Sequence, residues 1–307
     1  MMRETADPAA LAGKDARFAQ VDGIAIRYRR HGPDDGMPVV LIHGTLAWGE
    51  TWRDIAAPLG EAGYRVIMPD IPPFGFSERP DDHDYSRQAQ ALLMTGLLDS
   101  LALERPVLVG HSFGGGGTVE AAASRPAEIR ALVLIDVALG LSVEARKEPW
   151  FAPAFRIGQL RTALASATFA NPLLVPSGLR AFVADDSVVT GERVELYRRP
   201  LATTGTSEAI GDWMKTGLYG THEGAATLTP AGLAVLDMPT LIIWGRQDTV
   251  TPLAQGEEIA ALLPDARLVV LDGVNHIPHI ERPMGVLAAL LPFLAEQRAG
   301  TVSDLRP

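Results

Sequence analysis

Short, continuously apolar segments recur along the chain, each followed by a polar or amphipathic stretch. They are PVVLIHG, YRVIMPD, RPVLVGHS, IRALVLIDV, MPTLIIWGRQD and ARLVVLDGVNH. A strand that is apolar at nearly every position is typical of a parallel sheet covered by helices on both faces. Amphipathic stretches such as TWRDIAAPLGEAG would supply those helices. The alternation therefore predicts an α/β fold with a mostly parallel sheet. At the N-terminal end, FAQVDGIAIRYRRHG predicts a β-hairpin that turns at Asp22 and Gly23.

The alternation is interrupted between residues 139 and 236. This segment has no clear buried strand and is rich in Ala, Leu, Pro and aromatic residues. We expect residues 1–138 and 237–307 to form the two parts of the α/β core, and residues 139–236 to form an inserted helical cap. The aromatic residues of the cap either pack it onto the core or line an apolar pocket. They are Trp150, Phe151, Phe155, Phe169, Phe182, Tyr197, Trp213 and Tyr219.

Composition excludes several classes of function. The 307 residues include no cysteine, so a cysteine nucleophile, a disulfide and a Cys-ligated metal are excluded. The net charge of −10 argues against binding to nucleic acid or to anionic membranes, because no basic cluster is available to neutralise phosphates. The polar segment MMRETADPAALAGKDARF has no apolar signal core, and no apolar run is long enough to span a membrane. We expect a cytoplasmic protein that needs no cofactor or metal; the sequence leaves its oligomeric state open.

One apolar segment leads directly into the glycine-rich sequence VLVGHSFGGGG, residues 107–117. A strand ending at Gly110 and a helix beginning near Gly114 leave only a tight turn for Ser112. Small neighbours let the strand and helix approach, and the turn lifts the serine hydroxyl towards the N-terminus of the helix, where negative charge is favoured. Ser112 is therefore the candidate nucleophile. A dinucleotide-binding loop fits less well, because the G-x-G-x-x-G pattern is absent at this strand end.

A serine nucleophile needs a general base. Among the seven histidines, His276 and His279 follow a late strand in ARLVVLDGVNHIPHIERP, and loops at such strand ends gather around the active site. His276 is nearer to the strand and is the predicted base, whereas His279 is expected to have a structural role.

The base needs an acid that holds its tautomer and stabilises the imidazolium. Asp248 ends PTLIIWGRQD, and Asp136 follows the strand in ALVLIDV. The chain order Ser–Asp–His favours Asp248, and Asp136 is then expected to be a loop-forming or capping carboxylate.

Two backbone N–H groups should bind the oxyanion formed by attack of the serine. One is predicted to be that of Phe113, directly after the nucleophile. The other should come from the loop LIHGTLAWGETW, where we assign Thr45, with Leu46 as the alternative. His43 and Gly44 are expected to shape this loop without taking part in the chemistry.

These motifs together resemble the α/β-hydrolase superfamily, in its helical-cap branch of serine esterases, haloperoxidase-like perhydrolases and carbon–carbon hydrolases. The resemblance spans residues 18–295 and rests on LIHGTLAWGETW, YRVIMPDIPPFGFSERP, VGHSFGG, WGRQD and GVNHIPHIERP, in the family's order. It implies a sheet of about eight strands with the catalytic residues at its C-terminal edge.

The sequence departs from the family pattern at four positions. Pro73 stands where a glycine is usual. Ser112 stands where the related dehalogenases and epoxide hydrolases have aspartate. His111 and Ile277 stand where carbon–carbon hydrolases usually have Asn and Trp. These last two differences argue against carbon–carbon cleavage.

We therefore predict a serine hydrolase that cleaves a small to medium apolar or aromatic ester, a small-molecule substrate, through an acyl-enzyme. The same residues are compatible with a lactonase, an amidase-like enzyme, a perhydrolase or a carbon–carbon hydrolase. A hydrolase-fold receptor that binds ligands without turnover is the alternative from another class.

Overall fold

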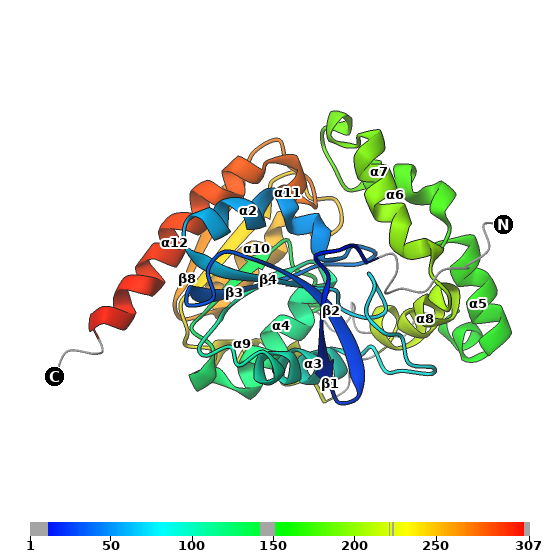
Figure 1. The fold of residues 1–307 in the computed structure, drawn as a ribbon, viewed down its shortest axis with the longest axis horizontal. Coiled ribbons are helices and arrows are strands. Elements are labelled where there is room, and N and C mark those ends of the chain that lie inside the picture. The colour runs from blue at the N-terminus through cyan, green and yellow to red at the C-terminus, as the bar shows by residue number, and fades with distance from the viewer. Residues whose placement is uncertain (1–11, 142–150, 221, 223, 304–307) are drawn as a thin grey trace.

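Eight strands form one sheet in the computed structural model, which describes residues 12–141, 151–220, 222 and 224–303 (Figure 1). The strand order is β1-β2-β4-β3-β5-β6-β7-β8. The pairs β1–β2 and β2–β4 are antiparallel, and all other pairs are parallel. The predicted mostly parallel sheet is confirmed. The strands are β1 (Arg17–Val21), β2 (Ile24–His31), β3 (Met37–Ile42), β4 (Tyr64–Pro69), β5 (Val107–His111), β6 (Ala131–Ile135), β7 (Thr240–Gly245) and β8 (Ala266–Leu271).

The predicted hairpin joins β1 to β2. Asp22 and Gly23 both have positive φ angles, 48° and 83°, as a two-residue type I′ turn requires. Val21 pairs with Ile24 across this turn, so the hairpin closes over two residues.

Alternate strand residues face opposite sides of the sheet and form two cores. Val40 and Ile42 pack with α3, α4, α9 and α10, whereas Val39 and Leu41 pack with α2 and α12 on the other face. Figure 1 shows α2 and α12 above the strands and α3, α4 and α9 below them. The helices of the core are α2 (Arg53–Glu61), α3 (Arg87–Ser100), α4 (Phe113–Ser124), α9 (Pro230–Ala234), α10 (Leu253–Leu262), α11 (Pro278–Glu281) and α12 (Pro283–Ser303), with the short 3₁₀ segments η1 (Gly49–Trp52) and η2 (Pro126–Glu128).

The described residues between β6 and β7 form helices and no strand. Figure 1 shows α5 to α8 grouped beyond one end of the sheet. That residues 139–236 act as a separate cap stays a prediction, and Trp150 lies outside the described residues. Besides α9, these elements are η4 (Ala152–Arg156), α5 (Gly158–Ala167), η5 (Pro172–Leu174), α6 (Val175–Ala181), η6 (Asp186–Val188), α7 (Gly191–Arg198), η7 (Arg199–Ala202), α8 (Thr206–Trp213), the π-helical η8 (Met214–Leu218) and η9 (Ala226–Leu228).

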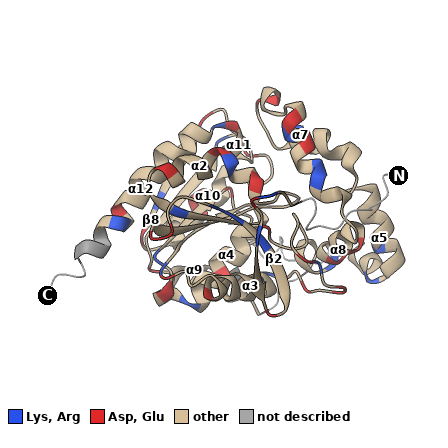
Figure 2. Cartoon of the chain, in the orientation of Figure 1, with Lys and Arg blue, Asp and Glu red and all other residues tan. Residues whose placement is uncertain are grey.

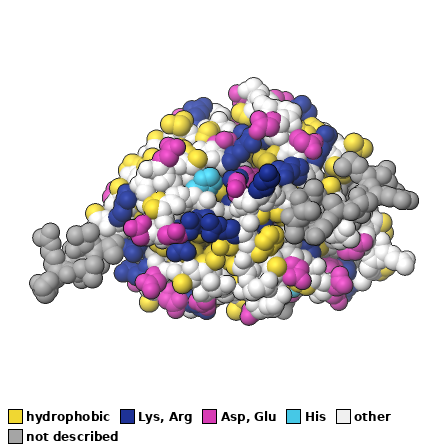
Figure 3. Space-filling view, viewed as in Figure 1, with side chains coloured by type: hydrophobic (Ala, Val, Ile, Leu, Met, Phe, Trp, Pro, Cys, Tyr) yellow, Lys and Arg dark blue, Asp and Glu magenta, His cyan; other side chains and the backbone are white. Residues whose placement is uncertain are grey.

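Acidic and basic side chains are interspersed over the surface. Figure 2 shows both kinds along the chain, and the face viewed in Figure 3 carries both with small hydrophobic areas between them. Within the described ranges, no helix is both long enough and apolar enough to cross a membrane.

A buried ion pair ties the loop after β3 to the strands beside it. Arg27 is 1% exposed, and its Nη1 donates to Asp70 Oδ1 over 3.1 Å. The same carboxylate accepts the backbone N–H of Gly49 at 2.8 Å and that of Phe76 at 2.8 Å. Glu50 accepts a further bond from Arg27 over 3.3 Å. These contacts anchor the end of the loop that carries Thr45, one of the two predicted oxyanion residues.

Asp70→Asn should lower the free energy of unfolding by about 3 kcal/mol, because it leaves a buried guanidinium with reduced compensation. It also turns an amide N–H₂ towards a backbone donor. Urea denaturation measures the loss, with the exposed Asp99→Asn as the matched control. A loss as small as that of the control would contradict a supporting role for this ion pair.

Candidate active site

Ser112 occupies the sharp turn between β5 and α4. Its φ of 50° and ψ of −127° form a conformation that non-glycine residues rarely adopt. The chain can fold this way because Gly110 and Gly114, two residues before and two residues after Ser112, have no side chains. A Cβ at Gly114 would lie 2.2 Å from the carbonyl oxygen of His43, and a Cβ at Gly110 would lie 2.9 Å from Gly115 Cα. Strand, helix and oxyanion loop therefore approach more closely than any other residue type would allow.

The structure brings the three predicted triad residues into one hydrogen-bonded chain. Ser112 Oγ lies 2.8 Å from His276 Nε2, and His276 Nδ1 lies 2.8 Å from Asp248 Oδ2. All three residues are buried. We assign the His276 proton to Nδ1, where it is donated to the carboxylate, so that Nε2 accepts from the serine hydroxyl. This arrangement allows His276 to remove the serine proton.

Asp248 is held as a carboxylate by several donors. Its Oδ2 accepts from Thr251 Oγ1 at 2.6 Å, and its Oδ1 accepts the N–H groups of Val250 and Thr251 at 2.7 and 2.9 Å. Burial raises the pKa of Asp248, but the hydrogen bonds from His276 and Thr251 outweigh burial, and the net pKa is lowered. The group facing His276 is therefore anionic at neutral pH.

Asp136, the alternative acid, forms no hydrogen bond with His276. Its Oδ1 accepts the N–H of Gly245 at 2.9 Å, and its buried carboxyl group shares a hydrogen bond with the side chain of Asp248, which requires a proton between the two groups. Burial, followed by the charge of Asp248, raises the pKa of Asp136 well above its usual value. These causes favour the protonated form of Asp136 beside the charged Asp248, and its bond to Gly245 matches the structural role expected for it.

The predicted oxyanion donors face no protein acceptor. The N–H of Thr45 donates to no described group, and Phe113 is the first residue of α4, so no earlier helical carbonyl reaches its N–H. Thr45 also lines the cavity that contains Ser112, whereas the alternative, Leu46, does not. The geometry therefore favours Thr45 over Leu46 as the second donor.

His43 holds two loops together, as expected. Its Nε2 accepts the N–H of Ile71 at 2.8 Å, and its Nδ1 lies 2.9 Å from the carbonyl oxygen of Gly44, to which it donates. Burial lowers the pKa of His43, so the ring is neutral and serves as a structural link.

His279, the alternative base, contacts Thr51 and Trp52 and forms no hydrogen bond with Ser112. Its Nε2 lies 3.0 Å from Thr51 Oγ1, and its ring stacks on Trp52 with centroids 4.2 Å apart. Burial and the neighbouring His111 lower the pKa of His279 well below its usual value.

Sequence reasoning missed the contacts that fix the loop of His276. His111 Nε2 donates to the carbonyl oxygen of His276 over 2.8 Å, and the N–H of His276 donates to the carbonyl oxygen of Phe182 over 3.0 Å. Burial, and then the neighbouring His276, lower the pKa of His111 to about 3, so it donates as a neutral ring. The adjacency of His111 to Ser112 was the only available signal for this role.

The glycines after Ser112 serve packing rather than phosphate binding. A Cβ at Gly115 would lie 2.3 Å from Val137 Cγ1, and a Cβ at Gly117 would lie 2.7 Å from Gln90 Cβ. These glycines lie against protein atoms and leave no room for a dinucleotide. Among the residues that the structure describes, no three His, Asp or Glu side chains are grouped to hold a metal ion.

Two adjoining cavities open beside the serine. An inner cavity of about 190 Å³ is lined by Ser112, His276 and Trp213, among others, and an outer one of about 410 Å³ lies under α6. Both cavities are lined by Thr45, Phe169, Leu179, Phe182 and Tyr197. Within the described part of the chain, no Lys, Arg, Asp or Glu lines either cavity. The space next to Ser112 therefore suits an uncharged, largely apolar group.

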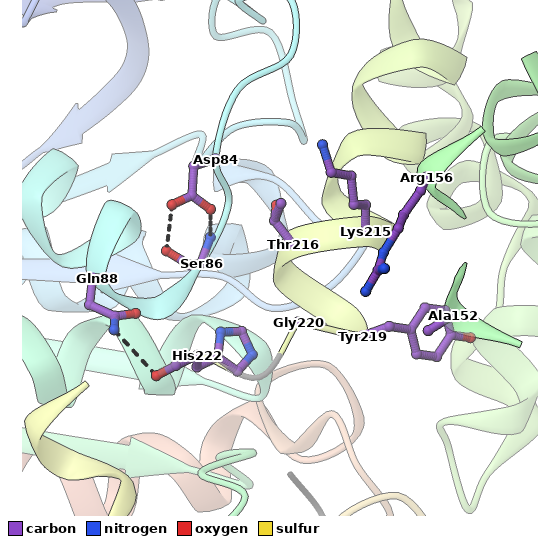
Figure 4. A pocket seen from close by; sticks show the side chains of 10 residues that line it. All are labelled: Asp84, Ser86, Gln88, Ala152, Arg156, Lys215, Thr216, Tyr219, Gly220 and His222. Atoms are coloured by element: carbon purple, nitrogen blue, oxygen red, sulfur yellow. Dashed lines mark hydrogen bonds between the residues drawn. The ribbon is translucent and has the colours of Figure 1, made fainter. Parts of the chain in front are cut away.

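A larger open pocket, of about 660 Å³, lies apart from the triad (Figure 4). Two residues of η8, Lys215 and Thr216, line this pocket, whereas Leu218 of the same helix lines the inner cavity. Its polar groups bond one another: Ser86 Oγ donates to Asp84 over 2.9 Å, as Figure 4 shows. None of its lining residues belongs to the predicted catalytic set.

A profile described as the alpha/beta hydrolase fold matches residues 37–283. The chain is 30% identical over 292 residues to a 2-hydroxymuconate semialdehyde hydrolase from Pseudomonas sp. strain CF600, covering 92% of this chain and 96% of that protein. The chain belongs to the α/β-hydrolase family, and the recognition made from the sequence is confirmed.

Solved structures agree with this assignment. A meta-cleavage product hydrolase from Pseudomonas fluorescens IP01 superposes with a TM-score of 0.75 at 25% identity, covering 94% of this chain and 99% of that one. A membrane phospholipase A superposes with a TM-score of 0.72 at 26% identity, covering 95% and 89%. The fold neighbours thus include enzymes named for two different kinds of substrate.

Asp136→Asn should become more stable relative to the wild type as pH rises from about 4 towards 7. The raised pKa of Asp136 means that the folded wild type retains a proton that the unfolded chain loses above about pH 4. Wild-type stability therefore falls by up to about 1.4 kcal/mol per pH unit until the folded-state pKa is passed. An amide mimics the protonated acid and has no such slope.

Urea denaturation of both proteins across this pH range measures the effect. Asp99→Asn is the control, because Arg125 lowers the pKa of Asp99 and its substitution gives no such rise. A stability difference between Asp136→Asn and wild type that stays constant with pH would show that Asp136 is ionised in the folded protein.

Proposed function

We propose that the protein is a serine hydrolase that cleaves uncharged carboxylic esters of small to medium acyl groups through an acyl-enzyme. The observation that carries this proposal is the chain from Ser112 through His276 to Asp248, opening onto cavities with no described charged residue. Family membership supports hydrolysis as the reaction class.

In the first half of the reaction, His276 Nε2 takes the Ser112 proton as Oγ bonds to the ester carbonyl carbon. The carbonyl electrons move onto its oxygen, which accepts the N–H groups of Thr45 and Phe113. The imidazolium, stabilised by Asp248, then protonates the leaving alcohol oxygen as the carbon–oxygen bond breaks. The acyl group remains on Ser112.

In the second half, water replaces the alcohol. His276 takes one water proton as the oxygen bonds to the acyl carbon, and the second tetrahedral intermediate uses the same two N–H donors. Its collapse breaks the bond to Ser112 Oγ, which recovers its proton from His276. The carboxylic acid product then leaves. Over the whole cycle one ester and one water give one alcohol and one acid, with no redox partner or metal required.

Carbon–carbon hydrolysis is the second candidate, and the names of the relatives favour it. Two observations weigh against it. A muconate semialdehyde carries a carboxylate, and neither cavity has a described cation to bind one. His111 and Ile277 also stand where that class usually has Asn and Trp. Turnover of 2-hydroxymuconate semialdehyde faster than of p-nitrophenyl butyrate would replace the ester proposal.

Ser112→Ala should reduce kcat for p-nitrophenyl butyrate by on the order of 10⁶-fold, and Asp248→Asn by about 10⁴-fold, because the first removes the nucleophile and the second the partner that orients His276. Initial rates at 400 nm measure both, and circular dichroism checks folding. Retained activity in Ser112→Ala would contradict the nucleophile assignment.

A wild type that binds esters, turns over none and takes no fluorophosphonate label would indicate a receptor.

Leu179→Ala should widen the acyl site, because Leu179 lines both cavities and is 6% exposed. We expect the kcat/KM ratio of octanoate to acetate p-nitrophenyl esters to rise roughly 10-fold, the effect of a few apolar contacts. Leu233→Ala is the matched control, since Leu233 is fully buried in α9 and lines neither cavity. An equal ratio in both variants would show that the acyl group binds elsewhere.

A further inference from the structure

Three polar side chains from distant segments meet at the wall of the inner cavity. Thr51 Oγ1, in η1, lies 2.5 Å from the hydroxyl of Tyr197 in α7 and 3.0 Å from His279 Nε2 in α11. All three residues are buried, and Thr51 and Tyr197 both line the cavity that contains Ser112. The catalytic cycle proposed above uses none of them.

The tautomer of His279 sets the direction of its hydrogen bond to Thr51. Its Nδ1 is buried and has no partner among the described residues, so a proton there would be an unsatisfied buried donor. The tautomer with the proton on Nε2 leaves only a bare lone pair at Nδ1. We therefore assign Nε2–H as a donor to Thr51 Oγ1. The burial that lowers the pKa of His279 keeps the ring neutral.

Either hydroxyl of the Thr51–Tyr197 pair can donate to the other, and we assign Thr51 as the donor to the oxygen of Tyr197. The Tyr197 hydroxyl then accepts one hydrogen bond from a described residue and donates none. Its proton has no described acceptor. A hydroxyl that accepts from a hydroxyl is also polarised towards donating, because hydrogen bonds in a chain reinforce one another.

Packing fixes the position of this donor. Trp48 Nε1 donates to the carbonyl oxygen of Leu196, the residue before Tyr197, over 3.1 Å. Trp48, Leu196 and Tyr197 belong to one buried cluster with Ile277, which follows the predicted catalytic histidine. The phenol ring therefore packs with Leu196 of its own helix and with Trp48 and Ile277 of the segments around β3 and β8.

We propose that Tyr197 determines acyl specificity by donating its O–H to an acceptor oxygen on the acyl chain. The preferred substrates are then esters whose acyl chain carries an oxo or ether oxygen, rather than plain alkanoates. This inference rests on the proposed ester hydrolysis. A plain chain leaves the buried donor unpaired, which a site built around a hydrogen bond discriminates against.

The test is a scan of p-nitrophenyl hexanoate against analogues in which each inner chain CH₂ in turn is replaced by C=O or O. In the wild type, kcat/KM of the best analogue should exceed that of hexanoate by about 5–10-fold, the worth of one neutral hydrogen bond. In Tyr197→Phe the same ratio should fall to about 1. Tyr219→Phe is the matched control and should keep the wild-type ratio, because Tyr219 lines the separate 660 Å³ pocket and neither the inner nor the outer cavity.

A ratio that Tyr197→Phe leaves unchanged would overturn the proposal, as would a wild type that prefers hexanoate over every analogue. A binding arm separates this inference from the proposed function. Titration calorimetry of hexanoate and oxohexanoate ethyl esters against Ser112→Ala, with and without Tyr197→Phe, measures the preference without turnover. If the wild type hydrolyses no ester but the oxo preference in binding depends on Tyr197, ester hydrolysis fails and the specificity assignment stands. If binding shows no such preference, the specificity assignment fails.

Discussion

The close approach of α4 to the loop after β3 is the constraint on which the rest of the site depends. A Cβ at Gly114 would overlap the carbonyl oxygen of His43, and a Cβ at Gly44 would lie 2.8 Å from Ser112 Cβ. Missing side chains at these two positions place the strained serine, the Thr45 N–H and the start of α4 side by side. The buried Arg27–Asp70 pair anchors the end of the same loop, because Asp70 also accepts the N–H of Gly49. Preorganised donors of this kind stabilise a developing oxyanion without reorganisation at the moment of reaction.

Two carboxyl groups at neighbouring strand ends take different protonation states because their surroundings differ. Asp248 receives hydrogen bonds from Thr251, Val250 and His276, which favour its charge. Asp136 has one backbone donor and lies against Asp248, so burial and the neighbouring charge favour its neutral form. A single anion therefore faces the imidazole. This difference gives His276 one defined partner although two acids lie nearby.

The sequence predicted what depends on local pattern. Continuous apolar runs defined the parallel strands, and the strand–glycine–serine–glycine order defined the turn at Ser112. The roles of His111 and Phe182 around His276 were not predictable, because they are set by contacts between segments 165 and about 90 residues apart. The same holds for the Thr51–Tyr197–His279 chain, which spans three elements. Residues 139–236 carried only a composition signal, since the short helices described there have no long periodic pattern.

The central claim is that His276 activates Ser112 to form a covalent acyl-enzyme. Rapid mixing with p-nitrophenyl butyrate, acid quenching and mass spectrometry of the peptide that contains Ser112 test it most directly. We predict that this peptide gains the mass of one butyryl group within the first turnover, and that His276→Ala abolishes the gain. Ester turnover with no acyl adduct, or with the adduct on another residue, would contradict the account.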